Sequence, residues 1–195
     1  MIRKIQNILI FLTFFLFLFA CQKEEYLENI IFDNSLLSNI SINSAEKEIN
    51  ISYEAKIDDP FIDHVMVTSP KTRIISWLEN NIINFGTKNK IIINIEEASI
   101  SKKEVEREVK LAGVTKNQKE DLYELIFKVS FILFNDNDEI LGTAKAKVLR
   151  STTSAKFISL NERDRILDSL TLDGIKDLSD KSVELIKLHM PDYIL

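Results

Sequence analysis

Residue types on which many enzymes depend are rare in this chain. Its 195 residues include one cysteine, two histidines, four glycines and three prolines. A single cysteine permits no disulfide within the chain. The motifs G-x-S-x-G, G-x-x-x-x-G-K-[ST] and G-x-G-x-x-G do not occur, so the sequence carries neither a nucleophile elbow nor a glycine-rich phosphate loop.

The two histidines lie far apart in the sequence. His64 follows three aspartates in DDPFIDH, where a metal or acid–base site is one interpretation. A loop histidine paired with a nearby carboxylate is favoured, because no second histidine follows at a metal-ligand spacing. His189 is expected at the C-terminus of a helix, where an imidazolium interacts favourably with the helix dipole. We therefore expect no catalytic residue, no metal and no cofactor, and hence no enzyme.

Basic residues are outnumbered by acidic ones. The chain has 25 Lys and Arg against 30 Asp and Glu, which gives a net charge of −5. Removal of residues 1–20 would take away Arg3 and Lys4 and leave a charge of −7. Nucleic-acid binding needs clustered positive charge for phosphate contacts. The sequence therefore predicts no nucleic-acid partner.

The first twenty residues have the organisation of a signal peptide. Arg3 and Lys4 lie in a short positive segment, and residues 8–19 are apolar except for Thr13. A membrane-spanning helix needs about 20 apolar residues. This run is shorter and has the length of a signal-peptide core. The small residue Ala20 then precedes Cys21.

The tetrad Leu18-Phe19-Ala20-Cys21 resembles the lipobox of bacterial lipoproteins, although Phe19 is bulkier than usual. The resemblance implies that Cys21 receives a diacylglycerol thioether, that cleavage follows Ala20, and that the new amine is acylated, for example with palmitate. Several acyl chains hold a protein stably on a bilayer. We expect a lipid-anchored protein of the cell envelope that faces the periplasm, with the outer membrane favoured over the inner one. An uncleaved signal anchor is the alternative.

The remaining chain predicts a lipidated cysteine and stalk at 21–47 and one globular domain at 48–195. Period-two alternation indicates strands at 48–57 and 90–100 and a hairpin of 121–134 with 139–151. The stretch 69–86 predicts a helix with Ser69 as cap, Pro70 as first residue and Gly86 as the residue past its end. Residues 159–190 are helical after the capping box of Ser159 and Glu162, and Gly174 leaves open whether they form one helix or two. The charged segment 102–120 is predicted as a loop.

These elements predict an α+β fold. Consecutive strands joined by hairpins favour an antiparallel sheet, and two apolar helix faces favour packing on one side of that sheet. The expected inner faces are Tyr123, Leu125, Phe127, Val129, Phe131 and Leu133 on one strand and Ile140, Gly142, Ala144, Ala146 and Val148 on the next. The small residues of the second set indicate that a helix lies close to it.

Residues from about 58 to the C-terminus resemble a family of uncharacterised alphaproteobacterial lipoproteins. The matching stretches include FIDHVMVTSP, SWLENNIINFG, IIINIEEASI and RSTTSAKFISLNERDRI. Asp63-His64, Trp77 and Glu97-Ala98-Ser99 take the places of that family's Val-Glu-His stretch, helix tryptophan and acid-Ala-Ser run. Gly174 departs from the family pattern of a uniformly apolar last helix. The resemblance implies a periplasm-facing lipoprotein and supplies no reaction.

Two functions remain for the domain after these exclusions. The favoured one is a non-catalytic module that binds an envelope protein or assists envelope assembly, with Lys102, Lys103 and Lys110 as candidate interaction residues. The alternative is a carrier that holds an acyl chain or other apolar ligand between the helices and the aromatic strand face. A ligand-sized apolar cavity would favour the carrier.

Cys21→Ser should leave the domain folded while it abolishes acylation and cleavage after Ala20, because serine offers no thiol for the lipid. Labelling of cells with a radioactive fatty acid measures this directly. Equal incorporation into the variant and the wild type would contradict the anchor.

Overall fold

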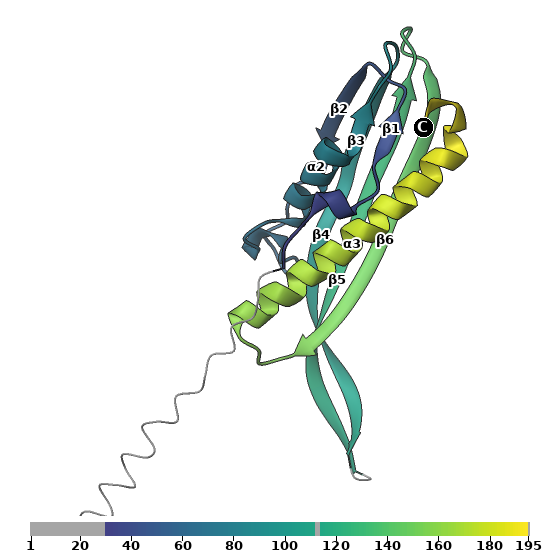
Figure 1. The fold of residues 1–195 in the computed structure, drawn as a ribbon. Coiled ribbons are helices and arrows are strands. Elements are labelled where there is room, and N and C mark those ends of the chain that lie inside the picture. The colour runs from purple at the N-terminus through teal and green to yellow at the C-terminus, as the bar shows by residue number, and fades with distance from the viewer. Residues whose placement is uncertain (1–29, 112–113, 195) are drawn as a thin grey trace, which may run out of the picture.

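A long four-stranded sheet carries two helices on one face (Figure 1). The computed structural model describes residues 30–111 and 114–194, with backbone only at 109–111 and 114–116. The sheet has the strand order β2-β4-β5-β6, and a separate two-stranded sheet pairs β1 with β3. The strands are β1 (Ile40–Ile42), β2 (Glu46–Ile51), β3 (Ile82–Asn84), β4 (Lys90–Leu111), β5 (Val114–Phe134) and β6 (Ile140–Ala155). The helices are α2 (Pro70–Asn81) and α3 (Leu160–His189), with short 3₁₀ turns η1 (Asn34–Leu36), η2 (Asp63–Val65) and η3 (Pro191–Tyr193).

The predicted α+β class is confirmed, but the sheet is mixed rather than antiparallel. β4, β5 and β6 pair antiparallel as expected. β2 pairs parallel with β4, with Ile49 opposite Ile93. The chain between β2 and β4, which includes α2, runs back along the sheet. β4 therefore starts at the same end of the sheet as β2, and the two strands pair parallel.

The predicted inner face of the central hairpin forms the core. Ile93, Phe131 and Ala144 are cross-strand partners, so their side chains share the face that the helices cover. All six inner residues of β5 are at most 1% exposed, as are Ile91, Ile93 and Ile95 of β4. Ile140 is 62% exposed and does not belong to this face. A bulge between Leu133 and Phe134 pairs Ile140 with Phe134 and turns it away.

Helix α2 begins as the sequence predicts and ends earlier. The Ser69 hydroxyl accepts a hydrogen bond from the Thr72 amide, and Pro70 is the first helical residue. Trp77 is fully buried on the core side. The helix ends at Asn81, because Ile82–Asn84 pairs with β1 instead. Lys47 donates to the carbonyls of Leu78, Glu79 and Ile82 (3.1, 3.2 and 2.7 Å) and so caps the helix C-terminus.

Helix α3 is one continuous helix. The Ser159 hydroxyl accepts from the Glu162 amide at 3.1 Å, which confirms the predicted cap. Gly174 is buried in the middle of the helix without splitting it. A Cβ at this position would lie 2.3 Å from Leu125 Cδ2 and 3.0 Å from Phe127 Cε2. Glycine is therefore the residue that lets α3 approach β5 closely.

The N-terminal boundary of the folded region lies before the expected residue 48. Leu37, Ile40 and Ile42 are buried in the main core cluster. The Asn81 side-chain amide donates to the carbonyl of Asn34 and to other groups of this segment. Part of the expected stalk at 21–47 is thus built into the domain, because its apolar residues complete the core beside α2.

The strand predicted at 48–57 is shorter than its alternation indicates. β2 ends at Ile51, and Ile57 is 79% exposed. Tyr53 remains buried, and its hydroxyl donates to Asp63 Oδ2 at 3.0 Å. The amides of Ser52 and Tyr53 both donate to the Ile95 carbonyl of β4 (3.0 and 3.2 Å), so regular pairing stops here, and the Tyr53 side chain joins this end of the strand to η2.

The segment 102–120, predicted as a loop, continues β4 and β5 as a paired ribbon. Its register runs without interruption from Lys102 opposite Tyr123 to Leu111 opposite Val114. Charged residues occupy both faces of the ribbon, so the sequence shows no apolar alternation there. Backbone pairing rather than a buried face defines these strands.

The described residues exclude the predicted signal peptide. The predicted cleavage site at Ala20 and lipidation site at Cys21 lie outside them. Within residues 30–111 and 114–194, neither helix combines the length and the hydropathy that crossing a bilayer requires.

Gly174→Leu should destabilise the domain by about 1 kcal/mol. Overpacking a filled core costs about 1–3 kcal/mol, and leucine recovers about 1 kcal/mol of helix propensity. Thermal unfolding should then show a midpoint about 2–4 °C lower. Lys176→Leu on the exposed side of the same helix is the matched control and should change the midpoint little. Equal midpoints for the two variants would contradict the close packing at Gly174.

Candidate functional site: the β4–β5 arm

The four-stranded sheet narrows to two strands at one end of the molecule. β2 follows β4 only as far as Ile95, and the segment at Pro60–Ile62 then bonds to Ile100 and Lys102. β6 stays paired with β5 only as far as Glu120. Beyond these positions β4 and β5 pair only with each other among the described strands. We call residues 103–111 and 114–119 the arm, and Figure 1 shows it projecting beyond the body of the domain.

Eight of the nine described side chains of the arm face solvent, and Val105 is half-buried. The exposed residues are Lys103, Glu104, Glu106, Arg107, Glu108, Asn117, Gln118 and Lys119. None of them belongs to the core cluster. The hydrophobic stabilisation of the domain therefore does not depend on them.

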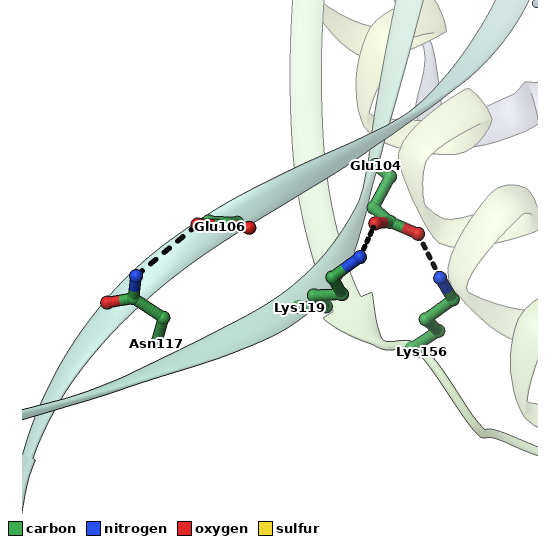
Figure 2. Close-up of polar contacts among 5 residues, drawn as sticks. All are labelled: Glu104, Glu106, Asn117, Lys119 and Lys156. Carbon is green, nitrogen blue, oxygen red and sulfur yellow. Dashed lines mark hydrogen bonds and ion pairs between the residues drawn. The ribbon is translucent and has the colours of Figure 1, made fainter.

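Glu104 is the centre of the polar contacts at the base of the arm. Its carboxylate binds Lys119 across the ribbon at 2.6 Å and also binds Lys156. Lys156 lies between β6 and α3, so this pair ties the arm to the body. One step further out, the Asn117 amide donates to Glu106 at 3.4 Å. Figure 2 shows these contacts side by side on one face of the ribbon.

Further ion pairs follow the same two strands. Lys103 binds Glu124 at 2.7 Å, and Arg107 lies 3.6 Å from Glu120. Lys102 binds Asp121 at 2.7 Å, and Asp121 is only 4% exposed. Cross-strand charge pairs are the side-chain contacts that stabilise a ribbon lacking a buried face. Each exposed pair contributes little alone, but together they favour one register.

The ion pairs shift the acidity of the groups that form them. Hydrogen bonds from Lys119 and then from Lys156 lower the pKa of Glu104 to about 2. The hydrogen bond to Glu104 raises the pKa of Lys119, and the hydrogen bond to Asp121 raises the pKa of Lys102. Glu104, Lys119 and Lys102 therefore remain ionised at neutral pH.

The candidate interaction residues lie on one element but do not form one patch. Lys102 and Lys103 are adjacent in β4 and so point to opposite faces, and each already binds a carboxylate of β5. The backbone of Lys110 pairs with Thr115 near the tip, and its side chain lies outside the described ones. The sequence analysis missed Glu104, Lys119 and Lys156, although the alternating charges of KKEVERE and KNQKE signalled a paired ribbon.

The two histidines take no part in a site among the described residues. His64 is exposed in η2, and the neighbouring Asp63 binds Tyr53 instead. Burial is the main cause that raises the pKa of the Tyr53 hydroxyl. His189 is the last residue of α3, as predicted. Within residues 30–111 and 114–194 no group of three His, Cys, Asp or Glu side chains could hold a metal ion.

The aromatic face on which the carrier alternative depends is filled by protein. Tyr123, Phe127 and Phe131 are at most 1% exposed, and Gly174 of α3 lies against Phe127. A hollow of about 410 Å³ lies elsewhere, between β6 and α3, and most of its lining residues are charged. This hollow does not suit an acyl chain.

Comparisons with known proteins add little to this geometry. No protein-family model matches the chain, and no curated protein matches it. A crystal structure of a minor lipoprotein from Acinetobacter baumannii is similar at 11% identity and a TM-score of 0.36, covering 74% of this chain and 92% of that chain. Likeness at this level carries no argument about the present chain. The resemblance to alphaproteobacterial lipoproteins stays a prediction.

Lys119→Met should raise the pKa of Glu104 from about 2 toward the ordinary value of 4.5, because it removes the main hydrogen bond to the carboxylate. A pKa below its unfolded value means that the pairing stabilises the ribbon above pH 4.5 and is lost as the pH falls toward 2. An NMR titration of the carboxyl carbon measures this pKa. Lys103→Met, which removes a partner of Glu124, is the control. An unchanged Glu104 pKa in Lys119→Met would contradict the pairing.

Proposed function

We propose that the protein is a lipoprotein of the bacterial cell envelope that binds a partner protein through the arm and catalyses no reaction. Acylated Cys21 holds it on the membrane with the domain facing the periplasm. The binding function is inferred from the arm, because the arm projects from the domain and its described side chains do not belong to the core.

The anchor rests on residues 1–21. A positive segment, a short apolar run, a small residue and the only cysteine follow one another in the order of a lipoprotein signal. The first described residue is Ile30, and an extended chain rises at most about 3.6 Å per residue. Cys21 therefore holds the first residue of the domain within about 30 Å of the bilayer.

The arm has the properties of a docking element. Both outer edges of its two strands lack a partner among the described strands, so their backbone groups can bind an extended segment of another protein. Its charged faces can steer a partner of complementary charge, and a membrane tether raises the local concentration of envelope partners. Its cross-strand ion pairs keep it ordered before binding, which lowers the entropic cost of association.

The test is a protein with a shortened arm. Residues 107–118 are replaced by Asn-Gly, a favoured hairpin turn, between Glu106 and Lys119, which are partners in the ribbon. The contacts of Glu104 with Lys119 and Lys156 are kept. We expect the thermal midpoint to fall by less than about 4 °C, fatty-acid incorporation to persist, and specific cross-links to envelope proteins to disappear.

Two outcomes would contradict the proposal. An unchanged cross-linking pattern in the shortened protein would show that the arm is not the docking element. Enzymatic turnover by the wild type that His64→Ala abolishes would show that the domain is catalytic.

A further inference from the structure

The outer edge of β6 is a second surface whose backbone groups pair with no described strand. β6 is the last strand of the sheet, and no described strand pairs with its outer edge. It runs for 16 residues, whereas β2 at the opposite edge has only 6. A long outer edge presents a row of backbone donors and acceptors that another strand can pair with.

A shallow hollow of about 410 Å³, largely open to solvent, accompanies this edge. Lys147, Val148 and Leu149 of β6 form one wall, and α3 forms the other with Asp177, Asp180, Lys181 and Glu184. Leu149 is 61% exposed and, like Lys147, points to the face that the helices leave uncovered, so it lines the rim of the hollow. An edge strand beside a helix, with a hollow between them, is the arrangement in which an extended peptide adds to a sheet while its alternate side chains enter the groove.

The helix wall of the hollow has an acidic excess. Asp173, Asp177, Asp180 and Glu184 recur at helical spacing and so share one face of α3. Arg150 binds Asp177 at 3.1 Å and lies 3.5 Å from Asp173. The Ser38 hydroxyl donates to Asp180 at 3.3 Å. Neither Asp180 nor Glu184 has an ion-pair partner within the described part of the chain, although Lys181 lies on the same helix.

The face of β6 that points away from α3 is basic, whereas the neighbouring face of α3 is acidic. Lys145 and Lys147 are both exposed in β6 and point to the face that the helices leave uncovered. Lys145 lies 3.6 Å from Glu96. Lys147 has another lysine, Lys128, as its cross-strand partner and forms no ion pair with the described side chains.

We propose that an extended segment of a partner protein pairs with the outer edge of β6 as a fifth strand of the sheet. Its basic side chains point toward Asp180 and Glu184 of α3, and its acidic side chains lie beside Lys145 and Lys147. Both sets come from one strand because successive side chains of a strand point to opposite faces. The partner segment is thus recognised by alternating basic and acidic residues.

A second copy of this chain fits the edge less well. Antiparallel pairing of two β6 strands centred at Ala146 would place Lys145 of each copy opposite Lys147 of the other. Like charges directly opposite each other are destabilising, and edge lysines are a common protection against self-pairing. The lysines therefore select a partner of opposite charge.

The inference deepens the proposed function, because it names a second binding surface for a partner protein. The test uses the purified full chain in detergent and three fluorescent peptides of equal length. They alternate Lys with Glu, Lys with Thr, and Glu with Thr. Fluorescence anisotropy should show tightest binding of the Lys-Glu peptide. Lys147→Glu should weaken that binding about tenfold or more and shift the preference to the Lys-Thr peptide.

Two controls test charge position and backbone pairing separately. Lys88→Glu makes the same charge change in an exposed turn before β4 and should leave peptide binding unchanged. Peptides N-methylated at alternate residues keep their side chains but lose one set of amide donors. Methylation of the set that faces β6 should abolish binding, and methylation of the other set should not.

The inference is overturned if the Lys-Glu peptide does not bind, if Lys147→Glu and Lys88→Glu act alike, or if both methylated peptides bind as the parent does. The arm is intact in every protein of this experiment. A negative peptide-binding result would therefore overturn only the proposal about β6. A negative result in the shortened-arm experiment would overturn only the proposed role of the arm.

Discussion

The closeness of α3 to the sheet at Gly174 is the constraint on which the rest of the domain depends. No side chain larger than hydrogen fits there without moving Leu125 and Phe127. The approach lets one long helix cover β5 and β6, and it is matched by the small buried residues Ala144 and Ala146 of β6. Close contact along the helix excludes water from the aromatic face of β5, which is why that face is core and offers no space to an apolar ligand.

The same packing determines where the core ends and the arm begins. α3 starts at Leu160, after the point at which β6 leaves the sheet, so neither β6 nor α3 accompanies β4 and β5 any further. The apolar alternation stops with Tyr123 and Ile100, and charged residues follow. The ribbon then depends on backbone pairing and on contacts such as those of Glu104 with Lys119 and Lys156. Lys156 joins the first residues of the arm to the rigid body, so the arm has a defined base.

The sequence predicted those parts of the fold in which one face is buried and the other solvated. Alternation in 121–134 and the caps Ser69 and Ser159 were predicted correctly, because period and capping are local signals. The arm was missed because both of its faces are polar, and the parallel pairing of β2 was missed because register between distant strands leaves no local mark. Helix α2 ends at Asn81 because Ile82–Asn84 pairs with β1. Gly86 suggested a later end, because a local helix-stop signal carries no information about pairing with a distant strand.

The path of the chain relates the proposed anchor to the arm. The Phe32 ring lies 3.4 Å from the guanidinium of Arg73 in the first turn of α2, and Arg73 also binds Asp168 of α3. The N-terminal chain therefore enters the fold beside the first turn of α2. In sequence, α2 follows closely after the segment 60–62, which borders the base of the arm. The ribbon rises about 27 Å from Lys103 to Leu111, a length close to the reach of about 30 Å between Cys21 and Ile30. In the proposed function, anchor and arm therefore have similar reach from one end of the domain. That arrangement would bring the arm close to membrane-bound partners and leave the edge of β6 along the body for a second contact.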